Sequence, residues 1–288
     1  MKNRYCFTFC MCIAVWMTAC TERVDLDLEE AGEPHLVVFA EITNDTMAHE
    51  VHLSKSAPYF YNQAPEMVSG AIVSISDGES TIELQEDAER EGIYLTPDTY
   101  AGVTGRSYRL EVANVDVNDD GQLENYWAET EMKPTAPVYG VAVAYNSSWE
   151  GWEVGVFSKD NPDTEDYYLF KVYKNGVLYT DSIHEYWATD DRFFNGNEIN
   201  GPVVQYFEED KGDLVEKGDT ITLEMAGITK EYYDYVEGVG IETSEKIPIF
   251  SGPSANLKGN ISNDAFGFFA VMEVDRNSTV YNGQVVPE

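Results

Sequence analysis

The sequence predicts a mainly β protein in which two β-sandwich domains follow one another and the second domain carries one short helix. Short segments that alternate apolar and polar residues recur about every ten residues, as in strands that bury one face. The dipeptides Asp77-Gly78 and Asn175-Gly176 are typical of hairpin turns. Only one segment, near 229–237, has apolar residues at helical spacing. These observations favour packed sheets over a helical fold.

The chain begins with a segment that has the features of a secretory signal. Lys2 and Arg4 precede a mostly apolar stretch, and small residues lead to Cys20 in the sequence MTAC. This segment resembles the lipobox of bacterial lipoproteins, in which the cysteine thiol is lipidated and becomes the new N-terminus. We therefore expect a lipoprotein signal peptide over 1–19 and a lipidated acidic tether over 20–34. The alternative is an ordinary signal peptide in which the cysteine occurs by chance.

The cysteines and the charge limit the classes of function. All four cysteines lie between residues 6 and 20, and cleavage before Cys20 would leave only the acylated one. Neither a disulfide framework nor a thiolate metal site is therefore expected. With 52 acidic and 18 basic residues, the net charge is −34. Such a surface repels phosphate groups, which argues against nucleic-acid binding and for membrane contact through the lipid only. The acidity suits solubility at a cell surface, and an acidic face for cations or basic peptides is the alternative.

Residues 35–136 are expected to form an N-terminal immunoglobulin-like β-sandwich. A continuous apolar run suited to a strand buried on both faces comes first, and alternating segments follow; the strand signals lie at 36–43, 51–54, 71–76, 82–84, 93–95 and 108–112. The sequences SGAIVSISDG, GIYLTP and GRSYRLEV resemble the transthyretin-like or carboxypeptidase-regulatory type of immunoglobulin-like module. The prolines of Pro134–Pro137 (PTAP) cannot extend a central strand, so they mark the predicted domain boundary.

Residues 137–288 are expected to form a C-terminal β-rich domain. Strand patterns resume at 141–145, 152–157, 167–174 and 221–225. The helix that follows is indicated by four apolar residues that would share one face, namely Ile228, Tyr232, Tyr235 and Val236. Gly238 and Gly240 are expected to end this helix.

Four sequence blocks of the second domain carry a family resemblance. They are DYYLFKVYKNGVL, FNGNEI, KGDTITLEMAGITKEYYDYVEGV and PSANLKGNISNDAFGFFAV. In this order they resemble the motifs of the DUF4249 family of Bacteroidota outer-membrane lipoproteins, and the resemblance covers nearly the whole mature chain. It implies a surface or periplasmic lipoprotein from a family often encoded beside TonB-dependent outer-membrane transporters. It supplies no catalytic residue that can be assigned to a position in this chain.

The sequence lacks the common catalytic and nucleotide-binding motifs. HExxH, GxSxG, GxGxxG and GxxxxGK[ST] are all missing. The four histidines, at positions 35, 49, 52 and 184, show no zinc-ligand spacing and are expected at the surface or at pocket rims. The sequence therefore predicts a protein that is not an enzyme and has no cofactor. A carboxylate pair for glycoside cleavage stays open, because acidic residues are abundant.

One local motif points to a weak calcium site. Asp116, Asn118 and Asp120 place oxygen side chains at positions 1, 3 and 5 of a loop, and Gly121 occupies position 6. The pattern breaks at position 12, where Trp127 replaces the bidentate glutamate of a calcium loop. The alternative is a solvated hairpin tip with no bound ion.

Clustered aromatic residues are the other candidates for ligand contact. Exposed rings can stack on sugars or contact peptides. The candidates are Trp149, Trp152, Tyr186 and Trp187 in the second domain and Tyr59, Phe60 and Tyr61 in the first. The alternative is that these rings are buried by packing.

The expected function is that of a lipid-anchored accessory or binding protein of the cell envelope, which partners a TonB-dependent outer-membrane transporter in nutrient uptake. Its ligand would be a small molecule, a glycan or a peptide. Glu22 and Asp25 follow Cys20 closely and resemble the surface-export signals of Bacteroidota lipoproteins, which favours the cell-surface side of the outer membrane over the periplasmic side. The alternatives are a structural or adhesive surface lipoprotein and a glycan or peptide hydrolase.

Overall fold

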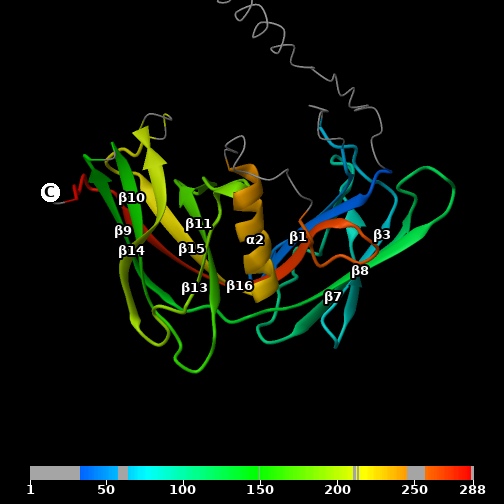
Figure 1. Ribbon diagram of the computed structural model, residues 1–288, viewed down its shortest axis with the longest axis horizontal. Coiled ribbons are helices and arrows are strands. Elements are labelled where there is room, and N and C mark those ends of the chain that lie inside the picture. Colours follow the sequence, from blue (N-terminus) through cyan, green and yellow to red (C-terminus); the bar gives the residue numbers. More distant parts are fainter. Residues whose placement is uncertain are drawn as a thin grey trace, which may run out of the picture. The chain divides into compact units, whose positions relative to one another are not determined.

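The computed structural model describes residues 33–57, 64–148, 150–209, 212, 214–244 and 257–286. The mainly β prediction is confirmed, because strands dominate this part of the chain and α2 (Lys230–Thr243) is its one α-helix (Figure 1). Within these residues, no helix has the length and apolar character needed to cross a membrane. The predicted signal peptide over 1–19 and nearly all of the predicted tether over 20–34 lie outside the described residues.

The N-terminal part folds as two facing sheets around one core. Its strands are β1 (Leu36–Thr43), β2 (Glu50–Lys55), β3 (Ile72–Ser76), β4 (Thr81–Glu83), β5 (Gln85–Glu86), β6 (Ile93–Leu95), β7 (Ser107–Val115) and β8 (Glu124–Glu131). β1, β2, β6 and β5 belong to one sheet, and β4, β3, β7 and β8 form the other. Buried side chains of both sheets, such as Val38 and Leu110, share one core. The expectation that β1 is buried on both faces is wrong: its buried and half-buried residues alternate, and Glu41 is on the second face.

The C-terminal part contains a three-stranded sheet and a long central sheet. Its strands are β9 (Val138–Asn146), β10 (Gly151–Lys159), β11 (Tyr167–Lys174), β12 (Val177–Leu178), β13 (Trp187–Asp190), β14 (Glu198–Glu208), β15 (Thr220–Ile228) and β16 (Phe266–Val280), with a 3-10 helix at Ile183–Glu185. The three-stranded sheet, in the order β14-β10-β9, shares a second core with β11 and β15, to which Val154 and Leu223 contribute. The Asn175-Gly176 hairpin turn is confirmed, since both residues have positive φ between β11 and β12.

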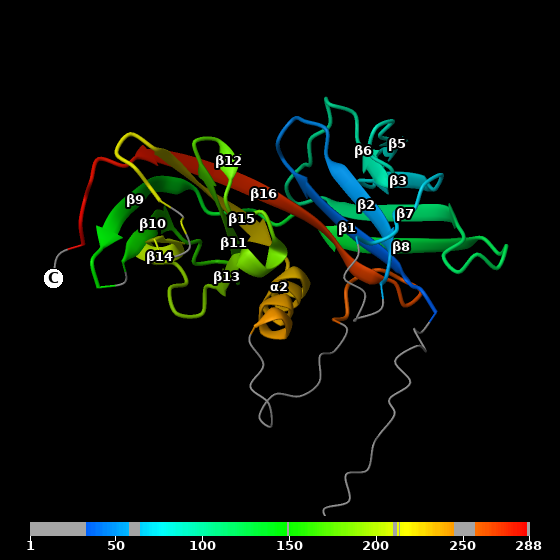
Figure 2. The same cartoon turned by 90° about the horizontal axis from the view of Figure 1, so that it is seen from above.

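A single strand, β16, connects the sheet structure of the two predicted domains. The sheet order is β12-β11-β15-β16-β1-β2-β6-β5, so β16 lies between β15 and β1 (Figure 2). The first half of β16 pairs with β1 in parallel, with Val38 opposite Gly267, and the second half pairs with β15. Phe269 and Val271 of β16 lie in the N-terminal core. The first half of β16 therefore completes the N-terminal sandwich, whose other strands all precede residue 136. The domain boundary at Pro134–Pro137 stays a prediction.

Helix α2 covers the face of the central sheet opposite to the three-stranded sheet. Thr229 caps its N-terminus, where the threonine hydroxyl accepts a hydrogen bond from the backbone nitrogen of Tyr232. Tyr232 and Val236 are buried against β11, β15 and β16, as their spacing predicts. The prediction that Gly238 and Gly240 end the helix is wrong, because α2 continues to Thr243. Each glycine costs a helix only about 1 kcal/mol, and packing on the sheet can offset that amount.

Residues 257–264, LKGNISND, form a connection that links β8 to β16. The Asn260 side chain donates to the carbonyl oxygens of Glu129 and Phe269 and accepts from the backbone nitrogen of Phe269. Ser262 and Trp127 exchange two further hydrogen bonds, each 2.8 Å long. These contacts satisfy backbone groups along the open edge of β8. This block of the family resemblance therefore has a structural role.

Candidate functional site

The predicted calcium loop lies between β7 and β8 and folds back on its own backbone. The Asp116 carboxylate accepts hydrogen bonds from the backbone nitrogens of Asp120, at 3.1 Å, and Gly121, at 2.9 Å. The Asn118 amide donates to the Asp120 carboxylate at 3.3 Å. These hydrogen bonds bring the three oxygen-bearing side chains together without an ion. Each carboxylate retains further lone pairs that could accept one. Calcium binding here stays a prediction, as does the simple hairpin tip.

The described aromatic candidates are placed differently from one another. Trp152 is buried between the rings of Tyr145 and Tyr281, and its indole nitrogen has no hydrogen-bond partner among the described atoms. The Tyr186 ring lies 4.4 Å from the Lys171 ammonium group. Trp187 is 46 % exposed on β13 and can meet a ligand directly. The remaining candidates, Trp149, Tyr59, Phe60 and Tyr61, lie outside the described residues.

A shallow pocket on the outer face of the three-stranded sheet adds an aromatic residue that the sequence analysis missed. It has a volume of about 370 Å³ and is lined by Gly151, Glu153, Tyr206, Phe207 and Glu208. Tyr206 is 40 % exposed, while its neighbour Phe207 points into the core. This volume falls within the range of small-molecule sites. The alternation of β14 contained the signal for an outward ring at Tyr206, but its pairing with β10 was needed to place Glu153 opposite it.

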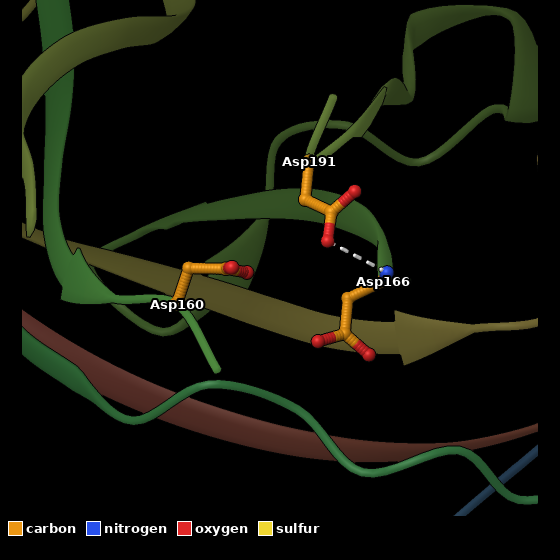
Figure 3. A group of neighbouring side chains, drawn as sticks. All are labelled: Asp160, Asp166 and Asp191. Atoms are coloured by element: carbon orange, nitrogen blue, oxygen red, sulfur yellow. Dashed lines mark hydrogen bonds between the residues drawn. The ribbon is translucent and has the colours of Figure 1, made fainter. Parts of the chain in front are cut away.

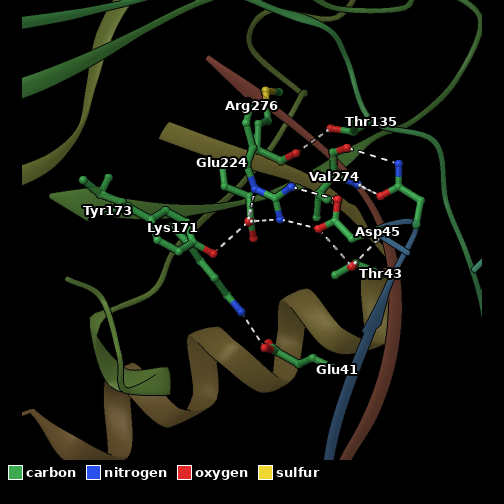
Figure 4. A network of polar contacts seen from close by, with 12 residues as sticks. Glu41, Thr43, Asp45, Thr135, Lys171, Tyr173, Glu224, Val274 and Arg276 are labelled. Carbon is green, nitrogen blue, oxygen red and sulfur yellow. Dashed lines mark hydrogen bonds and ion pairs between the residues drawn. The ribbon is translucent and has the colours of Figure 1, made fainter. Parts of the chain in front are cut away.

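A network of ion pairs connects β1 to β11, β15 and β16 (Figure 4). The Lys171 ammonium group donates to the Glu41 carboxylate at 2.5 Å. The Arg276 guanidinium lies between Glu224, which is 3 % exposed, and Asp45. Tyrosine hydroxyls complete the network, with Tyr232 donating to Glu41 and Tyr173 donating to Glu224. Each charged side chain of this network is paired with one of opposite charge and is hydrogen-bonded. The network therefore resembles a structural element of the fold rather than a reactive centre.

Three aspartates meet at a second place that no sequence motif indicated. One carboxylate oxygen of each of Asp160, Asp166 and Asp191 lies within 4.8 Å of the other two (Figure 3). Asp160 follows β10, Asp166 precedes β11 and Asp191 follows β13. Asp160 and Asp191 are almost completely buried. The pairing of β11 with β13 places Asp166 beside Asp191, and each backbone nitrogen of this pair bonds to an oxygen of the other residue.

Hydrogen bonds stabilise part of this negative charge. Asp160 accepts from the Tyr168 hydroxyl at 2.6 Å and from the backbone nitrogen of Gly196 at 2.7 Å. Asp166 accepts from the hydroxyl of Thr164. Burial nevertheless raises the pKa of Asp166 and of Asp191, and the neighbouring carboxylates add to both shifts.

Carboxylate oxygens at this spacing are ligands that a hard divalent cation accepts. Asp166 also lines a pocket of about 390 Å³ between β8 and the start of α2. The three aspartates are therefore a second set of described residues, besides the Asp116 loop, that could hold a metal. Two blocks of the family resemblance meet here, since Asp166 opens DYYLF and Gly196 belongs to FNGNEI.

Replacing Asp191 by asparagine is expected to stabilise the metal-free protein. The amide keeps an acceptor for the Asp166 backbone nitrogen and removes one of three crowded charges. We expect the Tm at pH 7 in EDTA to rise by about 2 to 4 °C, the change that about 1 kcal/mol produces in a chain of this size. The raised pKa of Asp191 favours folding at low pH, so the gain should shrink as the pH falls toward 3.8.

The matched control is Asp163→Asn, which removes an exposed charge from the same loop and should leave the Tm nearly unchanged. Thermal melts followed by circular dichroism compare the two variants. A lower Tm for Asp191→Asn than for the wild type in EDTA would contradict this account of the cluster.

Comparison with sequence models of protein families gives a match. The sequence model of a family described as Domain of unknown function (DUF4249) matches residues 21–278, a range that contains the three aspartates and the ion-pair network. No curated protein matches the chain.

Proposed function

The chain belongs to the DUF4249 family, and on this premise we propose that it is a lipid-anchored binding protein of the cell envelope. In this proposal it stands on the cell-surface side of the outer membrane and partners a TonB-dependent transporter in nutrient uptake. It captures or presents cargo and catalyses no reaction.

One observation carries the proposal. The sequence MTAC ends at Cys20, and the match to the family begins at the next residue. A basic start, a short apolar stretch and a cysteine directly before the matched region are what a lipoprotein signal followed by its mature chain would present. Two lipid chains on one residue anchor a protein stably, whereas one chain gives only marginal binding.

The described surface supports binding rather than turnover. Tyr206 and Trp187 present large exposed rings, which suit contact with a sugar or a peptide. The net charge of −34 would repel the folded part of the chain from anionic lipid headgroups and leave these rings accessible to a partner. The sequence also lacks the GxSxG motif of α/β-hydrolases, and cleavage before Cys20 would leave no free cysteine as a nucleophile.

Replacing Cys20 by alanine is expected to release the protein from the membrane. Labelled palmitate should enter the wild-type chain and not the variant, and the variant should move to the soluble fraction or accumulate as an uncleaved precursor, because the acceptor thiol is lost. Cys12→Ala is the matched control, since this cysteine would be removed with the signal and should not affect labelling. Equal labelling of Cys20→Ala and the wild type would overturn the anchor.

Partnership with a transporter is tested by purification from detergent. The full-length lipidated protein should co-purify with a TonB-dependent barrel, and mass spectrometry would identify it. A structural or adhesive lipoprotein would come through the same purification without a barrel. A hydrolase would cleave members of a glycan or peptide array, whereas a binding protein would retain them intact.

A further inference from the structure

The turn between β1 and β2, residues 44–49, fastens the N-terminal sheet to β16. The Asn44 side chain donates to the carbonyl oxygen of Val274 at 3.3 Å and accepts from its backbone nitrogen at 2.8 Å. The Asp45 carboxylate accepts two hydrogen bonds from Arg276, at 3.0 and 2.6 Å. The two side chains thus bind one short segment of β16, and Asp45 also joins the ion-pair network. The conformation of the turn determines whether these contacts can form.

A buried histidine, His49, bonds to backbone groups of this turn. His49 is 4 % exposed, so the expectation of a histidine at the surface or a pocket rim is wrong for this residue. Its Nδ1 atom accepts from the backbone nitrogen of Thr43 at 3.4 Å, and its Nε2 atom lies 3.1 Å from the carbonyl oxygen of Asp45. A backbone N–H can only donate and a carbonyl can only accept. The contacts therefore assign the neutral ring with its proton on Nε2.

We propose that His49 is an acid-sensitive latch: the neutral ring holds the β1–β2 turn in the shape that binds β16, and protonation of Nδ1 releases it. The protonated ring would have a donor at both nitrogens, so Nδ1 would meet the N–H of Thr43 and lose that hydrogen bond. The His49 ring would then no longer bridge the backbone of Thr43 at the end of β1 and the carbonyl group of Asp45. The contacts of Asn44 and Asp45 with β16 would weaken as a consequence.

The surroundings of His49 offer little to stabilise a positive charge. Asp45 is the acid whose charge acts on His49, but its carboxylate is already bonded to Arg276 and to the hydroxyl of Thr43. Tyr100, from the segment after β6, presents its ring edge-on at 6.1 Å, and burial raises its pKa so that it stays neutral. The backbone nitrogen of His49 bonds to the uncharged hydroxyl of Thr96. Burial accordingly lowers the pKa of His49 below its ordinary value of 6.5, and the carbonyl and charge of Asp45 offset part of this effect.

The sign of the pH effect follows from this lowered pKa. The unfolded or opened turn binds a proton near pH 6.5, and the closed turn binds it only at lower pH. The closed turn is therefore fully stabilised above pH 6.5 and loses stability as the pH falls through the window below it. Between the two pKa values, the population of the opened turn should rise about tenfold for each pH unit.

Hydrogen exchange of the wild-type chain tests the proposal. Protection factors of the amides of Val274 and Thr43, which bond to Asn44 and His49, should fall about tenfold per pH unit between pH 6.5 and the lower pKa of the closed turn, relative to amides in β7. His49→Gln, which keeps a neutral donor and acceptor, should remove this pH dependence. His52→Gln, at a half-exposed ring on the outer side of β2, is the matched control and should retain it.

A second measurement needs no variant. Long-range nitrogen NMR of the wild-type protein at pH 7.5 should show His49 protonated on Nε2, and its titration midpoint should lie below 6.5. The proposal is overturned if the proton is on Nδ1, if the midpoint lies at or above 6.5, or if the protection factors at Val274 do not change with pH. The same pH dependence in His49→Gln as in the wild type would overturn it equally.

Discussion

Replacing Lys171 by alanine is expected to lower the free energy of unfolding by about 3 to 5 kcal/mol. Lys171 is 7 % exposed and is the cation opposite Glu41. Without it, the Glu41 carboxylate would keep its hydrogen bond from the hydroxyl of Tyr232 but would have no paired cation among the described residues. Removing one partner of a buried pair leaves the other charge uncompensated, which costs more than the pair contributes. Urea denaturation of the variant and the wild type measures the difference.

The matched control for this prediction is Lys230→Ala. Lys230 pairs with Asp234 on the exposed surface of α2, and such a pair contributes about 0.5 kcal/mol. Adding Glu41→Gln to Lys171→Ala should recover part of the lost stability, because it removes the unpaired charge. If Lys171→Ala costs no more than Lys230→Ala, the network does not contribute as described.

The same network predicts a response to alkaline pH. Burial is the largest single effect and would lower the pKa of Lys171, but the charge and hydrogen bond of Glu41, together with Tyr186 and the charge of Glu224, outweigh burial and the pKa is raised. A cation whose pKa is raised in the folded state stabilises the fold below its ordinary value of 10.5 and loses this effect as the pH rises above it. The difference between the wild type and Lys171→Ala should therefore persist at neutral pH and shrink only in strong alkali.

Replacing Gly267 by alanine is expected to disturb the parallel pairing of β1 with β16. We expect it to lower the free energy of unfolding by about 3 to 5 kcal/mol. Gly267 has a φ of 91°, which side chains disfavour, and an added Cβ would lie 1.9 Å from the carbonyl oxygen of Val38. Val38 is its partner in the register of the two strands, so backbone would have to move. Soluble yield and urea denaturation of the variant measure the effect.

Gly240→Ala is the matched control for the glycine. Nothing lies within 4 Å of a Cβ at Gly240, which is in the last turns of α2, and alanine there should stabilise the protein by about 0.5 to 1 kcal/mol. A Gly267→Ala protein as stable as the wild type would mean that the β1 and β16 backbones do not approach as closely as described.

Strand positions were largely predictable because local periodicity determines them. The segments 36–43 and 167–174 coincide with β1 and β11. The helix start was also local, since Thr229 is a good N-cap before the apolar face of α2. Its end was not, because tertiary packing decides whether a helix continues through two glycines.

Strand order could not be predicted in the same way. The pairing of β1 with β16 joins residues more than 200 positions apart, and no local pattern indicates such a partner. The site residues show the same limit. Asp160, Asp166 and Asp191 follow no spacing rule, and only the pairing of β11 with β13 brings the last two together.

By itself, the sequence determined the β class, the family and the expectation of a lipid anchor at Cys20. These depend on periodicity and on short motifs, which neighbouring residues carry. The tertiary structure decided which charges meet. It buried Lys171 beside Glu41 and crowded three aspartates together, because these contacts join elements whose separation along the chain carries no signal. His49 contacts its own turn locally, but its burial also depends on Thr96 and Tyr100 from a later segment of the chain.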